Sequence, residues 1–456
     1  MNLETDNKIQ KKGITLVIPN PCGNIKETKM KNSGIEWIGE IPDDWESIRL
    51  KYIYSTTKAK LPKQFYDDKN LTPYLSMDFI RDSINTEPVY AKDGDYCSEE
   101  DILILWDGSN AGEIVFNHPA GYAPSTTAIL KKLSTQSLPV YDKFYLKALE
   151  DDLRRNTNGM GIPHVNGSYL NNSLFLLPPK STQQRIASYL DKKCSKIEET
   201  IQNQQQVIEK LKAYKQSLIT EAVTGKVKIA NGKICGEYES YKDSGVEYLG
   251  KIPSNWNVKR LRYIGKCQNG ISKGGEFFGS GYPFVSYGDV YNNLVLPETV
   301  SGLIESTPEE QENYSVTAGD IFFTRTSETI EEVGFTSVCL KTIEKATFAG
   351  FVIRVRPFTE ELVPDYSKYY FSSDAHRRFF VKEMNLVTRA SLSQDLLKRL
   401  PVLIPSKEEQ KEIANYLDKK CIAIDTAIEQ KQNLIEKLTE YKKSLIYECV
   451  TGKKEI

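Results

Sequence analysis

The sequence lacks the patterns that mark common metal, nucleotide and catalytic sites. Its eight cysteines include no C-x-x-C pair, which argues against a zinc site and against a dense disulfide framework. No G-x-x-x-x-G-K-[ST] phosphate loop is present, and His118, His164 and His376 are dispersed without a recognisable triad. We therefore expect reduced thiols in a cytoplasmic protein, with no bound metal and no catalytic centre in this chain.

An excess of one charge is also missing. The 456 residues contain 60 Lys and Arg against 61 Asp and Glu, a formal net charge of −1. This excludes a polybasic protein, so any nucleic-acid site must be a local basic surface. No apolar run is long enough to span a bilayer, and the polar stretch from Met1 to Lys12 has no apolar core of a secretory signal. We expect no membrane partner.

Two short matches to enzyme motifs are weak. Phe277-Phe-Gly-Ser-Gly matches the F-x-G-x-G of an S-adenosylmethionine loop, but no apolar strand precedes it and no N-P-P-Y or D-P-P-Y occurs in the chain. Pro364-Asp365 with Lys368 has the residue types of a metal-dependent nuclease, yet one carboxylate and one lysine are commonplace in a charged chain. Neither match predicts catalysis.

Internal duplication is the strongest feature of the sequence. Residues 31–53 and 242–264 share 12 of 23 positions at an offset of 211. Residues 186–226 and 413–453 share 25 of 41 positions at an offset of 227, and both copies end in VTGK. We call these four blocks the frame. The stretches inside the frame match poorly, which predicts one scaffold that carries two differing inserts.

The second block of each copy predicts a long helix with a heptad seam. Prolines precede both helices, and Gly225 and Gly452 end them. At ~1.5 Å per residue, about forty residues give a helix roughly 60 Å long. Glu and Lys surround the apolar positions, a pattern typical of a coiled coil. The seam positions are Leu190, Cys194, Ile197, Ile201, Ile208, Leu211, Leu218 and Ala222 in the first copy, and Leu417, Cys421, Ile424, Ile428, Ile435, Leu438, Leu445 and Cys449 in the second.

Polar residues interrupt both seams at matching places, at Gln204 and Lys431 and again at Lys215 and Lys442. Such residues lower stability but fix the register. The two helices could pair parallel or antiparallel. In an antiparallel pair Ile201 would face Lys431, and Gln204 would face Ile428. Each helix could instead pack only on its neighbouring globular domain or form a homo-oligomeric coiled coil.

The inserts predict mixed α/β domains. Asp101-Ile-Leu-Ile-Leu-Trp, Asp320-Ile-Phe-Phe-Thr-Arg, Thr127-Ala-Ile-Leu-Lys and Val352-Ile-Arg-Val-Arg indicate short buried strands, with polar loops between them. Side chains of these loops suit the reading of base edges and phosphates. The candidates are Lys58, Lys60, Lys63, Ser109, Asn110, Arg154, Arg155, Asn156, Asn158, His164 and Asn166 in the first insert, and Gln268, Asn269, Ser272, Lys273, Arg325, Thr326, Ser327, Thr388, Arg389 and Ser391 in the second.

The chain resembles the specificity subunits of type I restriction-modification systems. The resemblance lies in SGIEWIGEIPDDW and SGVEYLGKIPSNW, in Asp101-Ile-Leu and Gly319-Asp-Ile-Phe-Phe-Thr-Arg-Thr, and in the helices that end EAVTGK and ECVTGK. It implies an α+β fold with a pseudo-two-fold internal repeat, in which two long helices in an antiparallel coiled coil join two target recognition domains. The implied boundaries are an N-terminal arm at 1–30, domains at 31–178 and 227–403, and helices at 179–226 and 404–456.

In such a family each domain reads one half of a split double-stranded DNA site, and the helices set the spacer. The resemblance implies two methyltransferase subunits and restriction subunits as partners, with S-adenosylmethionine, ATP and Mg²⁺ bound by those partners and none by this chain. Two alternatives stay open at this point. The chain could be a coiled-coil adaptor that binds only protein, or a specificity chain with its own nuclease or methylase activity.

Overall fold

The computed structural model describes residues 29–159, 161–327, 333–383 and 390–456. The chain forms two compact units. Unit 1 comprises the chain up to Ile201 together with Glu436–Ile456, and unit 2 comprises Gln202–Ile435. Each long helix therefore contributes one of its ends to each unit. Of the expected N-terminal arm, residues 1–28 lie outside the described part of the chain.

Unit 1 is built around a four-stranded sheet in the order β10-β9-β12-β4. A second sheet has the order β5-β7-β6-β11-β8, and two small pairs are β1-β2 and β13-β3. The elements are β1 (Met30–Asn32), β2 (Glu40–Pro42), β3 (Glu46–Arg49), a 3₁₀ turn (Leu50–Tyr52), β4 (Tyr54–Lys58), β5 (Phe65–Tyr66), β6 (Thr72–Tyr74), α1 (Met77–Arg81), β7 (Val89–Ala91), β8 (Tyr96–Cys97), β9 (Ile102–Leu105), β10 (Ile114–Val115), β11 (Gly121–Tyr122), β12 (Thr127–Lys132), α2 (Pro139–Arg155), α3 (Gly167–Asn172), β13 (Leu174–Leu177) and the start of α4 (Lys180–Val223).

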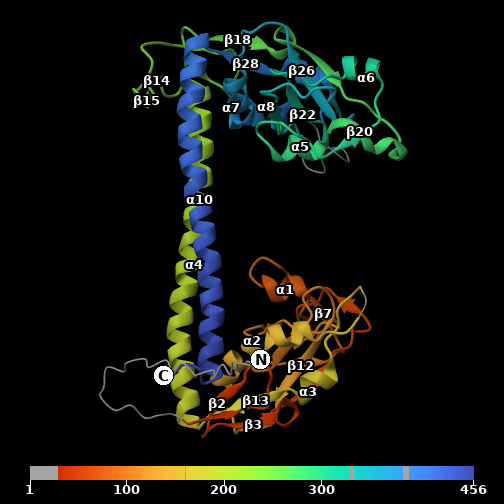
Figure 1. Cartoon of the computed structure of the whole chain (residues 1–456), viewed down its shortest axis with the longest axis vertical. Coiled ribbons are helices and arrows are strands. Elements are labelled where there is room, and N and C mark those ends of the chain that lie inside the picture. The colour runs from red at the N-terminus through yellow and green to blue at the C-terminus, as the bar shows by residue number, and fades with distance from the viewer. Residues whose placement is uncertain (1–28, 160, 328–332, 384–389) are drawn as a thin grey trace, which may run out of the picture. The chain divides into compact units, whose positions relative to one another are not determined.

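Unit 2 contains the sheet β19-β26-β22-β24, a sheet β21-β20-β25 and four two-stranded pairs. Helices α7 and α8 lie beside the larger sheet (Figure 1). The elements are β14 (Ile229–Ala230), β15 (Lys233–Ile234), β16 (Tyr241–Asp243), β17 (Lys251–Pro253), β18 (Asn257–Arg260), 3₁₀ turns (Leu261–Tyr263, Gly275–Phe277), β19 (Gly265–Asn269), β20 (Phe278–Val285), α5 (Tyr287–Asn292), β21 (Leu303–Ile304), α6 (Pro308–Asn313), β22 (Ile321–Thr324), β23 (Thr326–Ser327), β24 (Thr336–Val338), β25 (Thr347–Phe348), β26 (Val352–Pro357), α7 (Pro364–Ser372), α8 (Asp374–Glu383), β27 (Ala390–Ser391), α9 (Gln394–Arg399), β28 (Pro401–Ile404) and the start of α10 (Lys407–Val450).

The main sheets of the two inserts share one topology despite the dissimilar sequences of the inserts. The order β10-β9-β12-β4 in unit 1 matches β24-β22-β26-β19 in unit 2, and all pairings in both sheets are antiparallel. Ser76 caps α1 at the end of the stretch Pro73-Tyr-Leu-Ser, and Ser286 caps α5 at the end of the matching stretch Pro283-Phe-Val-Ser. The predicted buried strands are confirmed, since the side chains of β9 and β22 are buried throughout. The two variable inserts are therefore built on the same four-stranded sheet.

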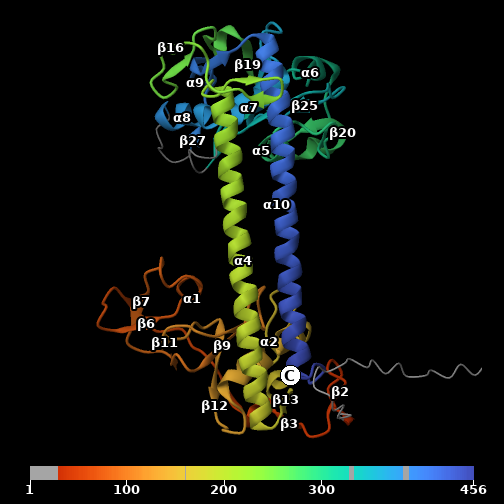
Figure 2. The ribbon, with the colours of Figure 1, turned by 90° about the vertical axis from the view of Figure 1, so that its left-hand side faces the viewer.

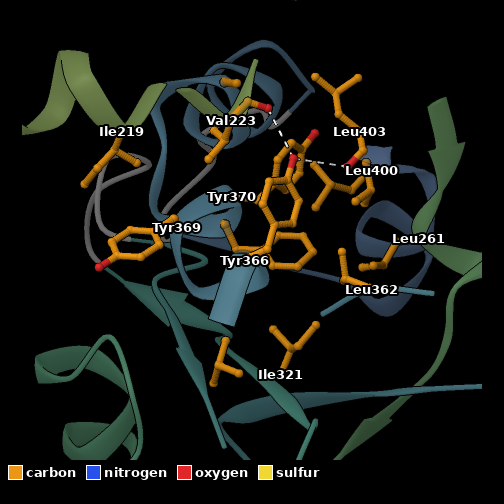
Figure 3. Close-up of a cluster of buried hydrophobic side chains, with 14 of the residues drawn as sticks. Ile219, Val223, Leu261, Ile321, Leu362, Tyr366, Tyr369, Tyr370, Leu400 and Leu403 are labelled. Atoms are coloured by element: carbon orange, nitrogen blue, oxygen red, sulfur yellow. Dashed lines mark hydrogen bonds between the residues drawn. The ribbon is translucent and has the colours of Figure 1, made fainter. Parts of the chain in front are cut away.

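A buried tyrosine joins the core of each unit to the end of a long helix. In unit 2 the Tyr366 hydroxyl lies 3.3 Å from the carbonyl oxygens of both Val223 and Leu403 (Figure 3). In unit 1 the Tyr141 hydroxyl lies 3.3 Å from the carbonyl oxygen of Val450. Each hydroxyl satisfies helix-end carbonyls that would otherwise be buried without a donor. The last turn of each long helix is thus part of a domain core.

The two long helices pair antiparallel within each unit (Figure 2). In unit 1 the first turns of α4, including Leu190 and Cys194, share a core with Leu445 and Cys449 from the last turns of α10. In unit 2 Leu218 and Ala222 from the end of α4 share a core with Leu417 and Cys421 from the start of α10. This excludes the parallel pairing and the packing of each helix on its own domain alone. The seam is most buried towards the helix ends, whereas Ile201, Leu211, Ile428, Ile435 and Leu438 are half-buried; Ile197, Ile208 and Ile424 are buried.

All four polar residues that interrupt the seams have partners on the other helix. The Lys431 Nζ donates to Gln204 Oε1 at 2.9 Å, so the two polar residues pair with each other and not only with isoleucines as expected. Lys215 forms an ion pair of 2.6 Å with Asp425. Lys442 forms the equivalent pair with Glu198. These contacts compensate for placing polar groups in the seam and support its register.

Among the described residues, every helix falls short of the combined length and apolarity needed to cross a membrane.

Candidate nucleic-acid interface

Strands β9 of unit 1 and β22 of unit 2 end in the same pattern of main-chain hydrogen bonds. In unit 1 the Trp106 amide donates to Thr126 O at 2.7 Å, and Val165 N donates to Trp106 O at 2.9 Å. In unit 2 the Arg325 amide donates to Phe351 O at 2.9 Å, and Leu392 N donates to Arg325 O at 2.7 Å. These bonds make Trp106 and Arg325 equivalent. The same ladder pairs Asp107 with His164 and Thr326 with Ser391.

We call the equivalent positions the reading edges. The first reading edge consists of Lys58, Trp106, Asp107, Thr126 and His164. The second consists of Asn269, Arg325, Thr326, Phe351 and Ser391. Lys58 is the last residue of β4, and Asn269 is the last residue of β19. The amide of the residue that follows each one bonds the neighbouring strand: Ala59 N donates to Thr127 O of β12, and Gly270 N donates to Val352 O of β26. Lys58 and Asn269 therefore correspond. The main chain thus carries unlike side chains at matching places.

The first reading edge is a charged cluster. The Asp107 carboxylate accepts from Lys58 Nζ at 2.8 Å and contacts His164 Nδ1 at 2.6 Å. Burial raises the pKa of the Asp107 carboxyl, but hydrogen bonds from Lys58 and His164 outweigh it and hold that pKa below its usual value. Lys58 and His164 are each about half exposed, at 47% and 48% of the side chain. One carboxylate therefore positions two exposed donors.

The second reading edge has no such ion pair among the described residues. Its polar groups are amide, hydroxyl and guanidinium: Gln394 Nε2 donates to Asn269 Oδ1 at 3.0 Å, and Tyr287 holds the main chain by donating to Thr326 O at 3.0 Å. A close main-chain approach fixes the edge, because a Cβ on Gly270 would lie 2.2 Å from Phe348 O. Ser391 is exposed and Arg325 is half-buried.

The other candidates of the first insert lie on the surface in separate places. Ser109 and Asn110 are exposed in the loop that follows Asp107, and Asn158 is exposed where it bridges His164. Lys60 and Lys63 are exposed, with their amides bonded to Asp95 and Asp93. Arg154 and Arg155 lie 3.9 Å from Glu113 and Asp152 at the end of α2. The structure joins Lys58, His164 and Asn158 but not the remaining lysines and arginines.

Four candidates use their polar groups inside the fold, which counts against their contacting bases. Asn166 caps α3 by accepting from Tyr169 N, and Asn156 bonds back to Asp152 O at the end of α2. The amide of Gln268 donates to Asn313 O and accepts from Arg354. Lys273 bonds Glu305 O and the Glu310 carboxylate, both at 2.7 Å. Single-residue patterns could not reveal these partners, which lie up to 86 residues away.

The remaining candidates of the second insert lie close to Gly350, in β23 or outside the described residues. Ser272 is exposed, and a Cβ on Gly350 would lie 2.2 Å from its Oγ. Ser327 is described only as part of β23, and Thr388 and Arg389 lie outside the described residues. Sequence patterns missed Asp107, Trp106, Thr126 and Phe351. Asp107 could have been found from its position two residues after the buried strand β9.

The weak enzyme matches have structural roles. Lys368 is buried on α7 and forms an ion pair of 2.8 Å with Asp418 on α10. Phe277 ends a 3₁₀ turn and lies beneath Lys273. Among the described residues, no group of three or more His, Cys, Asp or Glu side chains could hold a metal ion, and the described cysteines are free thiols.

Comparison with known proteins decides the family. A family model for the type I restriction modification DNA specificity domain matches residues 42–213 and 253–439, one match for each copy of the frame. The chain belongs to this family. It is 29% identical over 418 residues to the type I restriction enzyme MjaVIII specificity subunit of Methanocaldococcus jannaschii, covering 91% of this chain and 93% of that protein.

Other members of the family agree. The type I restriction enzyme EcoBI specificity subunit of Escherichia coli is 23% identical over 446 residues, covering 94% of this chain and 90% of that protein. A chain from a solved structure concerned with complex assembly and conformational transition of the type I R-M system aligns with a TM-score of 0.66 and 15% identity, covering 91% of this chain and 99% of that one. The expected α+β fold, with two mixed domains and two long antiparallel helices in a pseudo-two-fold repeat, is confirmed.

Proposed function

We propose that this chain is the DNA sequence-specificity subunit of a type I restriction-modification complex and that each unit reads one half of a bipartite site. The observation that carries the proposal is the pair of reading edges. One hydrogen-bonded main chain presents Lys58, Asp107 and His164 in unit 1, and Asn269, Thr326 and Ser391 in unit 2. Amino and imidazole donors suit guanine or phosphate, whereas an asparagine amide suits adenine.

The helices serve as the spacer and as the docking surface for two methyltransferase subunits. Support for docking comes from a hollow along the helix pair in unit 2, where glutamines flank two seam isoleucines. It is lined by Gln202, Gln205, Ile208, Gln432 and Ile435, among others. Ile435 is only half-buried there, which favours a third helix from a partner, because its full burial would remove apolar surface from water.

The chain itself is non-catalytic in this proposal. Adenine-N6 methylation and ATP-dependent cleavage belong to the partner subunits, which bind S-adenosylmethionine, ATP and Mg²⁺. The polar and charged side chains at the reading edges act by positioning: they set which base pairs lie opposite each unit and hold the DNA for the partners.

Exchange of one insert tests the proposal. We expect that replacing residues 54–175 with the insert of another specificity subunit changes one half-site and leaves the other half-site and the spacer as they were. Methylome sequencing of a host that expresses the variant with its methyltransferase reads both halves at once. A second variant, in which one heptad is deleted from each long helix, is the matched experiment. It should shorten the spacer and leave both half-sites unchanged. Methylation that ignores sequence in both halves would contradict the proposal.

A further inference from the structure

An exposed phenyl ring stands in the second reading edge. Phe351 is 64% exposed, although its neighbours Val352 and Ile353 are fully buried. Large apolar side chains at such exposure are common singly on protein surfaces and need no explanation there. This one lies among the polar candidates for base contact, and its carbonyl oxygen accepts from Arg325 N at 2.9 Å. Its place in the fold is what calls for a role.

The main chain holds the ring outward. Phe351 lies in a tight turn closed by Val352 N to Ala349 O at 2.9 Å. The two residues that follow β19 hold this turn: Gly270 N donates to Val352 O at 3.2 Å, and Ile271 N donates to the O of Phe348, just before the turn, at 2.9 Å. Ala349 N also donates to Val285 O at 3.0 Å. The ring therefore projects from a turn that is bonded on three sides.

The first reading edge has the same turn with a different side chain. Thr127 N donates to Pro124 O at 2.9 Å, which puts Thr126 where Phe351 stands, and Trp106 N donates to Thr126 O. Thr126 is also exposed. A phenylalanine ring and a threonine methyl share one capacity in the major groove, which is apolar contact with the C5-methyl group of thymine. Both edges thus offer an apolar group at a matching position.

We propose that the phenyl ring of Phe351 contacts a thymine methyl group and so specifies an A·T pair in the half-site read by unit 2. The inference rests on the proposed DNA-reading function and adds a specificity residue to it. The flanking groups fit this occupant: Arg325 and Ser272 suit phosphates or base edges. Asn269, whose Oδ1 accepts from Gln394 Nε2, can donate from its Nδ2 amino group to adenine, which is the other base of the pair. An apolar protein partner would not require polar donors around the ring.

Deoxyuridine gives a direct test because it lacks only the methyl group. The complex of this chain with its modification subunits is titrated with duplexes that carry its own site, in which each thymine of the second half-site is replaced singly by deoxyuridine. We expect one replacement to weaken binding by the wild type about fourfold, the value of one buried methyl group. The same replacement should leave binding by Phe351→Ala unchanged, and Phe351→Ala should bind the thymine duplex about fourfold more weakly.

Phe358→Ala is the matched control. Phe358 is 62% exposed in the same unit, directly after β26, and forms no part of the reading edge. It should behave as the wild type on every duplex. Equal losses for wild type and Phe351→Ala, no response at any thymine, or a Phe351→Ala defect in subunit assembly would each overturn the inference. Binding that does not distinguish the site from scrambled DNA would instead overturn the proposed function.

Discussion

The two units share a scaffold and differ at their reading edges. The scaffold repeats down to single hydrogen bonds: Gln183 Oε1 accepts from Leu138 N at 2.8 Å in unit 1, and Gln410 Oε1 accepts from Val363 N at 2.8 Å in unit 2. Tyr145 donates to Leu174 O and Tyr370 to Pro401 O, both at 2.8 Å. The two reading edges share their main-chain hydrogen bonds but not their side chains.

The difference follows from what each region must satisfy. The repeated groups are buried, and a buried donor or acceptor without a partner costs free energy, so both residue type and position are constrained. The edge side chains are exposed or half exposed, and the sheet beneath them is held by main-chain bonds that any residue can make. Exchange of edge residues therefore has little effect on the fold, which suits a surface that must differ between two halves of a site.

The largest effect tests whether the scaffolds are equally important. Trp256 is fully buried and Trp45 is 4% exposed at the matching place. We expect Trp256→Ala to lower the free energy of unfolding of unit 2 by about 3–5 kcal/mol, and Trp45→Ala to do the same in unit 1. Chemical denaturation followed by hydrogen exchange assigns each loss to its unit. Phe358→Ala should change stability by less than about 0.5 kcal/mol. A loss in only one unit would break the comparison.

The glycine that ends each helix provides the next test. Gly452 has φ +72°, and a Cβ there would lie 2.3 Å from Pro42 Cδ; Gly225 has φ +69° and the same clash with Pro253. Either glycine replaced by alanine should cost about 2–4 kcal/mol, from backbone strain plus overlap with a rigid ring. Gly250 also has a positive φ, +65°, but a Cβ there would meet no atom within 4 Å, so Gly250→Ala should lower stability by only about 1 kcal/mol. Thermal unfolding measures all three, and equal losses would refute the role of the proline contact.

A pH test separates the units further. His376 in unit 2 is buried with Nε2 3.1 Å from Gly334 O, and burial, together with the charge of Arg377, lowers its pKa to about 3. The unfolded chain takes up this proton near pH 6.5 and the folded chain does not, so stability is full above pH 6.5 and falls as the pH drops towards 3. The loss is about 1.4 kcal/mol per pH unit within that window.

We expect His376→Phe to flatten the dependence of unit 2 stability between pH 6.5 and 5, a span worth about 2 kcal/mol. Denaturation at a series of pH values checks it, with unit 1 as the internal reference. If the variant and the wild type lose stability in parallel over that range, His376 is not the source.

The smallest effect concerns the ion pairs that cross the seam. Lys215 with Asp425 in unit 2 matches Lys442 with Glu198 in unit 1. Because the carboxylates are more than half exposed, Asp425→Ala and Glu198→Ala should each cost under about 1 kcal/mol, and the cost should shrink in 1 M salt. Urea denaturation at low and high salt gives the comparison. A larger, salt-independent loss would indicate a packing defect.

Sequence patterns predicted much of the fold and less of the interface. The two seams, Leu190 to Ala222 and Leu417 to Cys449, and the strands at Ile102 and Ile321 follow from local patterns along the sequence. The interface depends on partners far apart in the chain. Gln268 and Asn166 have the right chemistry for bases, but Arg354 and the α3 amide at Tyr169 use their polar atoms. His164 and Ser391 became equivalent only through their ladder partners, Asp107 and Thr326.

The sequence by itself determined that a frame occurs twice, that its second block is a long amphipathic helix, and that the inserts differ. Those features are local or repeated, so periodicity and identity suffice. Only the tertiary structure decided that the helix of the second copy ends on the first unit, where Tyr447 donates to Trp37 O across 410 residues of chain. It also decided which side chains share an edge. Contacts of that separation depend on how surfaces pack, and no pattern of neighbouring residues encodes them.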